Sequence, residues 1–187
     1  MPAGEKPLFK YVWNTTVKNL NIYGERIEGG GLVDAYTGVG LDGCAVDIES
    51  VTLKSGSRTL KSGLVASAGG SGFAHASSGF VVAIRNCVVE DSVTVGYDGT
   101  QSQIGSIAGR VNGVIEGCFS SAMVKGVNYV GGILGTRDNA MGQCVVENSS
   151  FHGVVESSGN CAGGVVGGGY DNSTAPNGAR PTIEGCR

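Results

Sequence analysis

A short element of glycine and aliphatic residues recurs along this chain, and it constrains the fold more than any other feature. Its copies are Gly31-Leu32-Val33, Gly63-Leu64-Val65, Ser106-Ile107-Ala108-Gly109, Gly132-Ile133-Leu134-Gly135 and Gly164-Val165-Val166-Gly167. The fourth copy lies within "NYVGGILG", which on its own has the glycine content of a phosphate-binding loop. A ligand-binding loop is usually present once, whereas a loop that recurs is a unit of architecture. We therefore interpret it as part of a structural repeat.

A second element, a triplet of one aliphatic, one charged and one small residue, precedes each copy of the first by 14 to 18 residues. The triplets are Val17-Lys18-Asn19, Ile48-Glu49-Ser50, Val89-Glu90-Asp91, Ile115-Glu116-Gly117, Val146-Glu147-Asn148 and Ile183-Glu184-Gly185. Successive copies lie 26 to 43 residues apart. This period is typical of a solenoid or of a propeller blade.

The local pattern within each repeat is that of short strands. Stretches such as "VKNLNIYG" and "IESVTLKSG" alternate apolar and polar residues, which is the two-residue period of a strand. Glycine makes up 34 of the 187 residues, well above its usual share of about 7%. We expect two or three strands per repeat, with glycines at corners and at close approaches of the backbone.

Repeat length decides between the two repeat architectures. A propeller blade needs four antiparallel strands, and spacings of 26 and 31 residues are too short for them. The sequence therefore predicts an all-β fold, a parallel β-solenoid of about five to six coils that forms one domain over residues 1–187. Right-handed coiling is expected from the crossover rule. The longer spacings predict insertions, at Ala66–Gly79 and Gly167–Pro181.

The paired elements resemble the GLUG repeat of bacterial extracellular proteins, which is named for its Gly-Leu-any-Gly core. The stretch "VIEGCFSSAMVKGVNYVGGILG" is similar to a whole repeat of that family, and the cores ending at Gly109, Gly135 and Gly167 carry the likeness. The first two copies depart from it, because Asp34 and Ala66 replace the final glycine. The resemblance implies an exported bacterial protein, extracellular or at the cell surface. Because "IEGCR" starts a sixth copy and stops, we expect a fragment of a longer surface protein.

The six cysteines stand in repeated phrases. Cys87 and Cys144 open "CVVEDS" and "CVVENS", whereas Cys118 and Cys186 both follow "IEG". Cysteines at equivalent repeat positions are expected to stack as small buried hydrophobes. This interpretation as free thiols is favoured, but the even number also allows a disulfide. A zinc site is disfavoured because no C-x-x-C is present and the chain has only two histidines.

Composition and motifs exclude several classes of function. A net charge of −3 and a pI near 5.3 argue against nucleic acid and anionic membranes as partners. No apolar stretch is long enough for a membrane helix. "GVGLDG" matches a dinucleotide fingerprint, but strand-like residues follow it where a helix is needed. We predict no cofactor and no metal, and we interpret His75 and His152 as surface or ladder residues.

The candidate site follows from the repeat, because the residues just after each glycine-aliphatic element are expected to line one corner of the solenoid. Aromatic, charged and amide side chains on one side suit sugar binding. The alternative is a solvated row of loop residues. The candidate ligand-binding residues are Asp34, Tyr36, Arg110, Arg137, Asp138, Asn139, Tyr170 and Asp171, with Asn172 beside them.

The first functional hypothesis is a non-catalytic repeat segment of a bacterial cell-surface protein that acts in adhesion or as a stiff spacer. Its expected partners are host or dietary glycans and the rest of the parent polypeptide. The alternative is a carbohydrate-active β-helix, a glycoside hydrolase or polysaccharide lyase, or part of one. Glycoside hydrolysis needs two carboxylates about 5 to 9.5 Å apart, and Asp34, Asp138 and Asp171 qualify by position alone.

Overall fold

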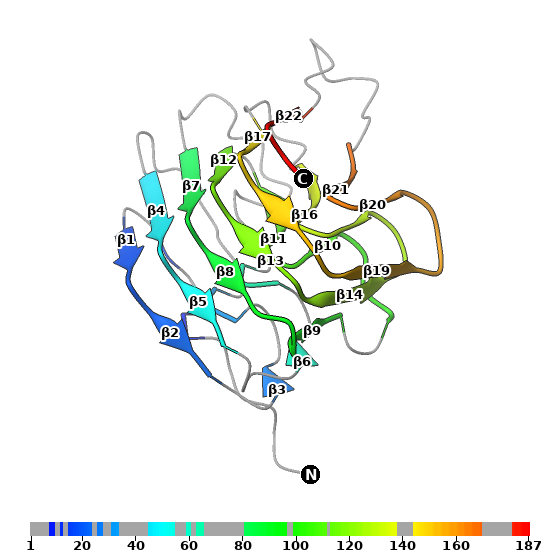
Figure 1. The fold of residues 1–187 in the computed structure, drawn as a ribbon, viewed down its shortest axis with the longest axis horizontal. Helices are drawn as coiled ribbons and strands as arrows, with labels where there is room; N and C mark the ends of the chain where they lie inside the picture. Colours follow the sequence, from blue (N-terminus) through cyan, green and yellow to red (C-terminus); the bar gives the residue numbers. More distant parts are fainter. Residues whose placement is uncertain are drawn as a thin grey trace.

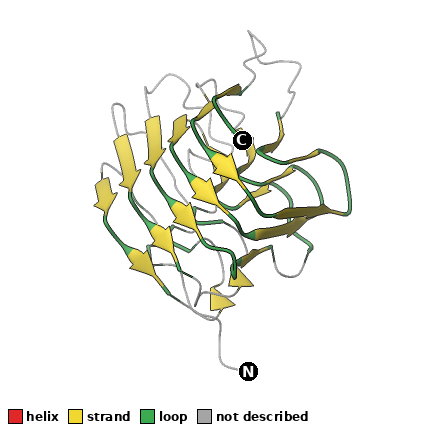
Figure 2. Cartoon of the chain, in the orientation of Figure 1, coloured by secondary structure: helices red, strands yellow, loops and turns green. Residues whose placement is uncertain are grey.

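The chain is all-β with parallel strands throughout the part that the structure describes. The computed structural model describes residues 8–9, 12, 15–23, 26–27, 31–33, 45–54, 59–60, 63–65, 81–96, 99–111, 113–137, 144–169 and 181–187. Within these residues there are strands, bends and turns but no helix (Figure 2). This confirms the predicted all-β class.

The strands form five sheets, numbered here in the order in which one repeat visits them. Sheet 1 contains β1 (Thr15–Lys18), β4 (Ala45–Glu49), β7 (Val81–Arg85), β12 (Gly113–Glu116), β17 (Cys144–Glu147) and β22 (Thr182–Glu184). Sheet 2 contains β2 (Asn21–Ile22), β5 (Thr52–Leu53), β8 (Val88–Val89), β13 (Phe119–Ser120) and β18 (Ser150–Phe151). Sheet 3 contains β3 (Arg26–Ile27), β6 (Thr59–Leu60), β9 (Thr94–Val95), β14 (Met123–Gly126) and β19 (Val154–Ser157).

The two remaining sheets have three strands each. Sheet 4 contains β10 (Ile104–Gly105), β15 (Val130–Gly131) and β20 (Ala162–Gly163). Sheet 5 contains β11 (Ala108–Val111), β16 (Leu134–Arg137) and β21 (Val166–Gly168). The repeats that begin at β7, β12 and β17 therefore have five strands, more than the two or three expected. Strands of only two residues are too short to show a periodic pattern, which is why the sequence did not reveal them.

Within each sheet, a strand pairs with the equivalent strands of the neighbouring repeats. In sheet 1, for example, β12 pairs in parallel with β7 on one side and β17 on the other. Figure 1 shows these strands in a row, with colours that advance along the sequence from β1 to β17. Parallel neighbours cannot be joined by a hairpin, so the chain passes through the other sheets before it returns. The repeats consequently lie side by side in order, and we call this arrangement the stack.

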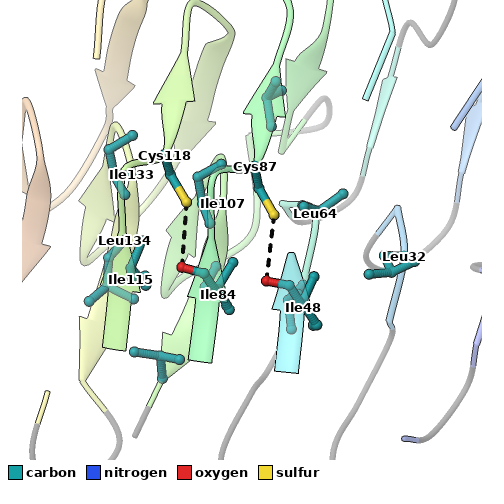
Figure 3. Packing of buried hydrophobic residues seen from close by; sticks show 14 of the residues in the cluster. Leu32, Ile48, Leu64, Ile84, Cys87, Ile107, Ile115, Cys118, Ile133 and Leu134 are labelled. Carbon is teal, nitrogen blue, oxygen red and sulfur yellow. Dashed lines mark hydrogen bonds between the residues drawn. The ribbon is translucent and has the colours of Figure 1, made fainter. Parts of the chain in front are cut away.

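The core is made of columns of aliphatic side chains at equivalent repeat positions. One column runs through the middle of sheet 1 and contains Val17, Ile48, Ile84, Ile115, Val146 and Ile183 in direct register. A second comes from the glycine-aliphatic element and contains Leu32, Leu64, Ile107 and Ile133, all fully buried, with Val165 at its end. Figure 3 labels Ile48, Ile84 and Ile115 of the first column, and Leu32, Leu64, Ile107 and Ile133 of the second. The predicted inward ladder of this element is confirmed.

A left-handed corner follows sheet 1 in every repeat. The residues there have φ between 49° and 60°, and they are Asn19, Ser50, Asn86, Gly117, Asn148 and Gly185. Glycine and asparagine tolerate this conformation best, because bulkier side chains clash with the backbone in it. The small residue of each triplet is therefore required by backbone geometry.

The corner also corrects one predicted triplet. The third copy is Ile84-Arg85-Asn86, since Ile84 aligns with Ile48 and Ile115, and Val89-Glu90-Asp91 is not equivalent to the others. Val89 instead belongs to sheet 2, beside Leu53. The error arose because the repeated acidic residue was taken as the marker, and the third repeat carries arginine at that position.

Several glycines within or beside the glycine-aliphatic element are required by close packing. A Cβ atom on Gly131 would overlap the carbonyl oxygen of Leu134 and lie 2.5 Å from the nitrogen of Gly167 in the next repeat. A Cβ on Gly135 would lie 2.5 Å from the nitrogen of Ile104. Two turns of backbone therefore touch with no room for a side chain. In the third copy Ser106 takes a glycine position, and its hydroxyl donates a hydrogen bond to the carbonyl oxygen of Gly132.

We predict that Gly131→Ala lowers the free energy of unfolding by about 1–3 kcal/mol, because the added methyl group must displace backbone in two repeats. The control is Gly164→Ala, in the following repeat, where an added Cβ meets nothing within 4 Å. We expect that change to stay within about 0.5 kcal/mol. Urea unfolding followed by circular dichroism measures both. Equal effects would contradict the packing role of Gly131.

Candidate functional site

The structure describes two of the predicted ligand-binding residues, Arg110 and Arg137. They lie on the neighbouring strands β11 and β16, but out of register, because Arg110 aligns with Thr136 and Val111 with Arg137. Arg110 is half-buried, and Arg137 is only 5% exposed. Asp34, Tyr36, Asp138, Asn139, Tyr170, Asp171 and Asn172 lie outside the described residues, and so does His75. Arg110 therefore has the more accessible position of the two.

A column of charged side chains runs along the outer side of sheet 1. The aligned residues are Lys18, Glu49, Arg85, Glu116, Glu147 and Glu184. Lys18 contacts Glu49 at 2.7 Å, and Arg85 contacts Glu116 at 3.2 Å. Arg85 also bonds Asp47 at 3.1 Å, so one guanidinium bridges acidic groups of the two repeats that flank it. The pairs are half-exposed, and such ion pairs are each worth less than about 1 kcal/mol.

Toward the end of this column the aligned side chains are all acidic. Glu116, Glu147 and Glu184 occupy three consecutive positions, and directly opposed like charges destabilise a sheet. No group of three or more metal-ligating side chains occurs among the described residues. Glu184 is exposed and Glu147 half-buried. Neither carboxylate is buried.

An aromatic pair lies on the outer side of sheet 2. The rings of Phe119 and His152, from consecutive repeats, have centroids 5.4 Å apart and an interplanar angle of 36°. Phe119 is 37% exposed, and His152 is exposed. Aromatic faces of this kind cover the apolar faces of sugar rings. The prediction that His152 is a surface residue is confirmed, but its partner was missed, since the two occupy diagonal rather than equivalent repeat positions.

A third feature is a column of small side chains just after the left-handed corner, where Cys87, Cys118, Ser149 and Cys186 follow one another. Each thiol donates a weak hydrogen bond to a backbone carbonyl oxygen of the preceding repeat, at a residue of the sheet 1 aliphatic column. Cys87 donates to the Ile48 oxygen at 3.9 Å, and Cys118 donates to the Ile84 oxygen at 3.6 Å (Figure 3). Cys186 does the same to the Val146 oxygen at 3.4 Å. The neighbouring Cys87 thiol and burial together raise the pKa of Cys118.

The cysteines confirm one predicted equivalence and overturn another. Cys118 and Cys186 share a column, but Cys87 and Cys144 do not, because Cys144 aligns with Gly113 at the start of sheet 1. Their shared phrase is a coincidence of sequence. The five described cysteines, Cys87, Cys118, Cys144, Cys161 and Cys186, are all free thiols. Burial raises the pKa of Cys144 to about 12, although the positive charge of Arg137 acts to lower it.

Comparison with known proteins identifies no relative. No protein-family model matches the chain, and neither a curated protein nor a solved structure matches it significantly. The GLUG resemblance stays a prediction. The described residues also contain no helix long and apolar enough to cross a membrane.

Exposure predicts the order in which the thiols react. At pH 8 we expect iodoacetamide to modify Cys161, which is exposed, and to leave Cys87, Cys118 and Cys144, which are buried, intact until urea unfolds the chain. Peptide mapping by mass spectrometry measures each site. If Cys118 were modified as fast as Cys161 in the folded protein, the burial of Cys118 in the column of small side chains would be contradicted.

Cys144 also predicts a loss of stability at alkaline pH. Its folded-state pKa of about 12 exceeds the ordinary value of 9.0, so the stability that it contributes is complete below pH 9 and is lost as the pH rises toward 12. Between pH 8 and 10.5 we expect wild type to lose about 1–2 kcal/mol more than Cys144→Ala. Urea unfolding at both pH values tests this, with Cys161→Ala as a control that should behave like wild type.

Proposed function

We propose that the chain is a non-catalytic, right-handed β-solenoid segment of five to six coils from a bacterial cell-surface protein, serving in adhesion or as a stiff spacer. The observation that supports this is the parallel pairing of equivalent strands in five sheets, which places the same outward positions next to one another in successive repeats. The GLUG-like pairing of the two sequence elements adds the expectation of an extracellular or cell-surface location.

Stiffness follows from the direction of the hydrogen bonds. In every sheet they join one repeat to the next, so they run along the stack and resist its extension and bending. The two buried aliphatic columns add packing in the same direction. A spacer needs this mechanical property and no catalytic group.

In adhesion, the side chains that repeat on the outer side of the sheets would each make a weak contact with the ligand. Ligand contacts repeated at regular spacing raise the overall affinity without any single strong site. The Phe119–His152 pair offers an aromatic face for a sugar ring, and Arg110 represents the predicted corner. Glycans of host or dietary origin are the ligand class that suits both surfaces.

The experiment is a glycan and mucin array with the purified chain, with each hit followed by mass spectrometry for released sugars. We expect binding without release. Phe119→Ala/His152→Ala should weaken binding about tenfold or more if the aromatic face carries it, equivalent to about 1.4 kcal/mol. Arg110→Ala tests the predicted corner in the same way, and Tyr23→Ala, which removes a 66% exposed ring in the first repeat, is the control.

Each result separates the functions. Release of sugars would refute the non-catalytic proposal in favour of a carbohydrate-active enzyme. If the chain bound no glycan, the proposed role in adhesion to sugars would be refuted, and the proposed role as a spacer would remain. Equal loss in Tyr23→Ala and in the double variant would show that neither aromatic position is specific.

A further inference from the structure

Two cysteines from consecutive repeats stand next to each other in the column of small side chains. Cys87 follows β7 and Cys118 follows β12, each directly after the left-handed corner of its repeat. Backbone hydrogen bonds join the two repeats on both sides of this pair. The Asn86 nitrogen donates to the Glu116 oxygen at 2.9 Å, and the Phe119 nitrogen donates to the Cys87 oxygen at 2.9 Å. The backbones at the two cysteines are therefore held at the spacing of neighbouring strands, about 4.8 Å.

This spacing suits a disulfide, because the Cα atoms of bridged cysteines usually lie about 4.4 to 6.8 Å apart. The side chains of Cys87 and Cys118 also extend in the same direction from neighbouring repeats (Figure 3). A hydrogen bond with the Cys87 thiol is the main cause of the raised pKa of Cys118, so the two sulfur atoms lie within reach of each other. A bridge between them therefore needs rotation of the two side chains rather than rearrangement of the stack.

The rest of the column selects this pair. Val51 precedes Cys87 in the column, since the Val88 nitrogen donates to the Val51 oxygen at 2.9 Å. Ser149 follows Cys118, and its hydroxyl accepts a hydrogen bond from the Cys118 nitrogen at 3.1 Å. Cys186 comes one repeat later and is separated from Cys118 by this serine. Within the described part of the column, Cys87 and Cys118 are thus the one adjacent pair of cysteines.

The surroundings of the pair favour a lasting bridge. The hydrogen bonds that both thiols now make to carbonyl oxygens, at 3.9 Å for Cys87 and 3.6 Å for Cys118, are long. A thiol is a weak donor, so the loss of these bonds opposes oxidation only slightly. Cys87 is 0% and Cys118 is 1% exposed. A disulfide at this place would therefore be shielded from reductants in the solvent.

We propose that Cys87 and Cys118 form a disulfide that joins consecutive repeats when the chain folds in an oxidising environment. The oxidant is a small disulfide such as oxidised glutathione. The thiolate of one cysteine attacks it and releases one reduced thiol; the second cysteine then loses its proton and displaces the other half from the mixed disulfide. The two protein thiols thus lose two hydrogens, and the small disulfide is reduced to two thiols. This exchange takes place during folding, before burial excludes the oxidant.

Refolding of the fully reduced chain from urea, in a buffer of reduced and oxidised glutathione, tests the proposal. Peptide mapping by mass spectrometry without reduction identifies the linked cysteines. We expect the link between Cys87 and Cys118 to be the main disulfide, although six cysteines compete. The oxidised chain should melt about 5 °C or more above the reduced chain, because the link closes a loop of about 30 residues in the unfolded state. The disulfide should resist dithiothreitol in the folded chain and be reduced once urea is added.

Two serine variants provide the matched comparison. Cys118→Ser removes one partner, and we expect it to lose both the link and the rise in melting temperature. Cys186→Ser changes a cysteine of the same column that has no thiol beside it, and it should behave like wild type. Circular dichroism verifies that both variants are folded. A refolded wild-type chain that keeps Cys87 and Cys118 as thiols, or that links either of them mainly to another cysteine, would overturn the proposal. So would an equal rise in melting temperature in Cys118→Ser.

Discussion

Backbone hydrogen bonding between equivalent positions of successive repeats is the constraint on which the rest of this structure depends. Every described strand pairing is parallel and joins one repeat to the next, so the position of each residue is set by its partner a whole repeat away. Once this register is fixed, side chains at equivalent positions must lie over one another. The aliphatic columns, the column of small side chains that contains Cys118, and the charged column are all consequences of this register.

The same constraint explains the unusual composition. A left-handed corner in every repeat limits one position to small or amide residues, such as Asn86 and Gly117. The close approach of two backbone turns limits another position to glycine, such as Gly131. The remaining inward positions need compact apolar side chains. A chain built in this way has few places for charge, and its described ion pairs lie on the outer side of the sheets, where they join one repeat to the next.

The amino-acid sequence predicted those parts of the structure in which every repeat has the same type of residue at the same position. The glycine-aliphatic element was recognised in every copy, because Leu64, Ile107 and Ile133 keep the same character in the same place. The third triplet was misplaced because Arg85 reverses the usual charge. The Phe119–His152 pair was missed because diagonal neighbours share no repeat position. The burial of Arg137 has no signal in the sequence, since an arginine is normally exposed.

The left-handed corner limits how such a chain could grow. The last four corner residues alternate between asparagine and glycine, with Asn86 before Gly117 and Asn148 before Gly185, whereas the first two are Asn19 and Ser50. A Cβ atom on either glycine would lie 2.6 Å from the amide oxygen of the asparagine one repeat earlier, so each asparagine occupies space that its glycine neighbour leaves. Loss or duplication of a single repeat would place two asparagines or two glycines in sequence. Over these four repeats, the packing unit at the corner is therefore a pair of repeats rather than a single one.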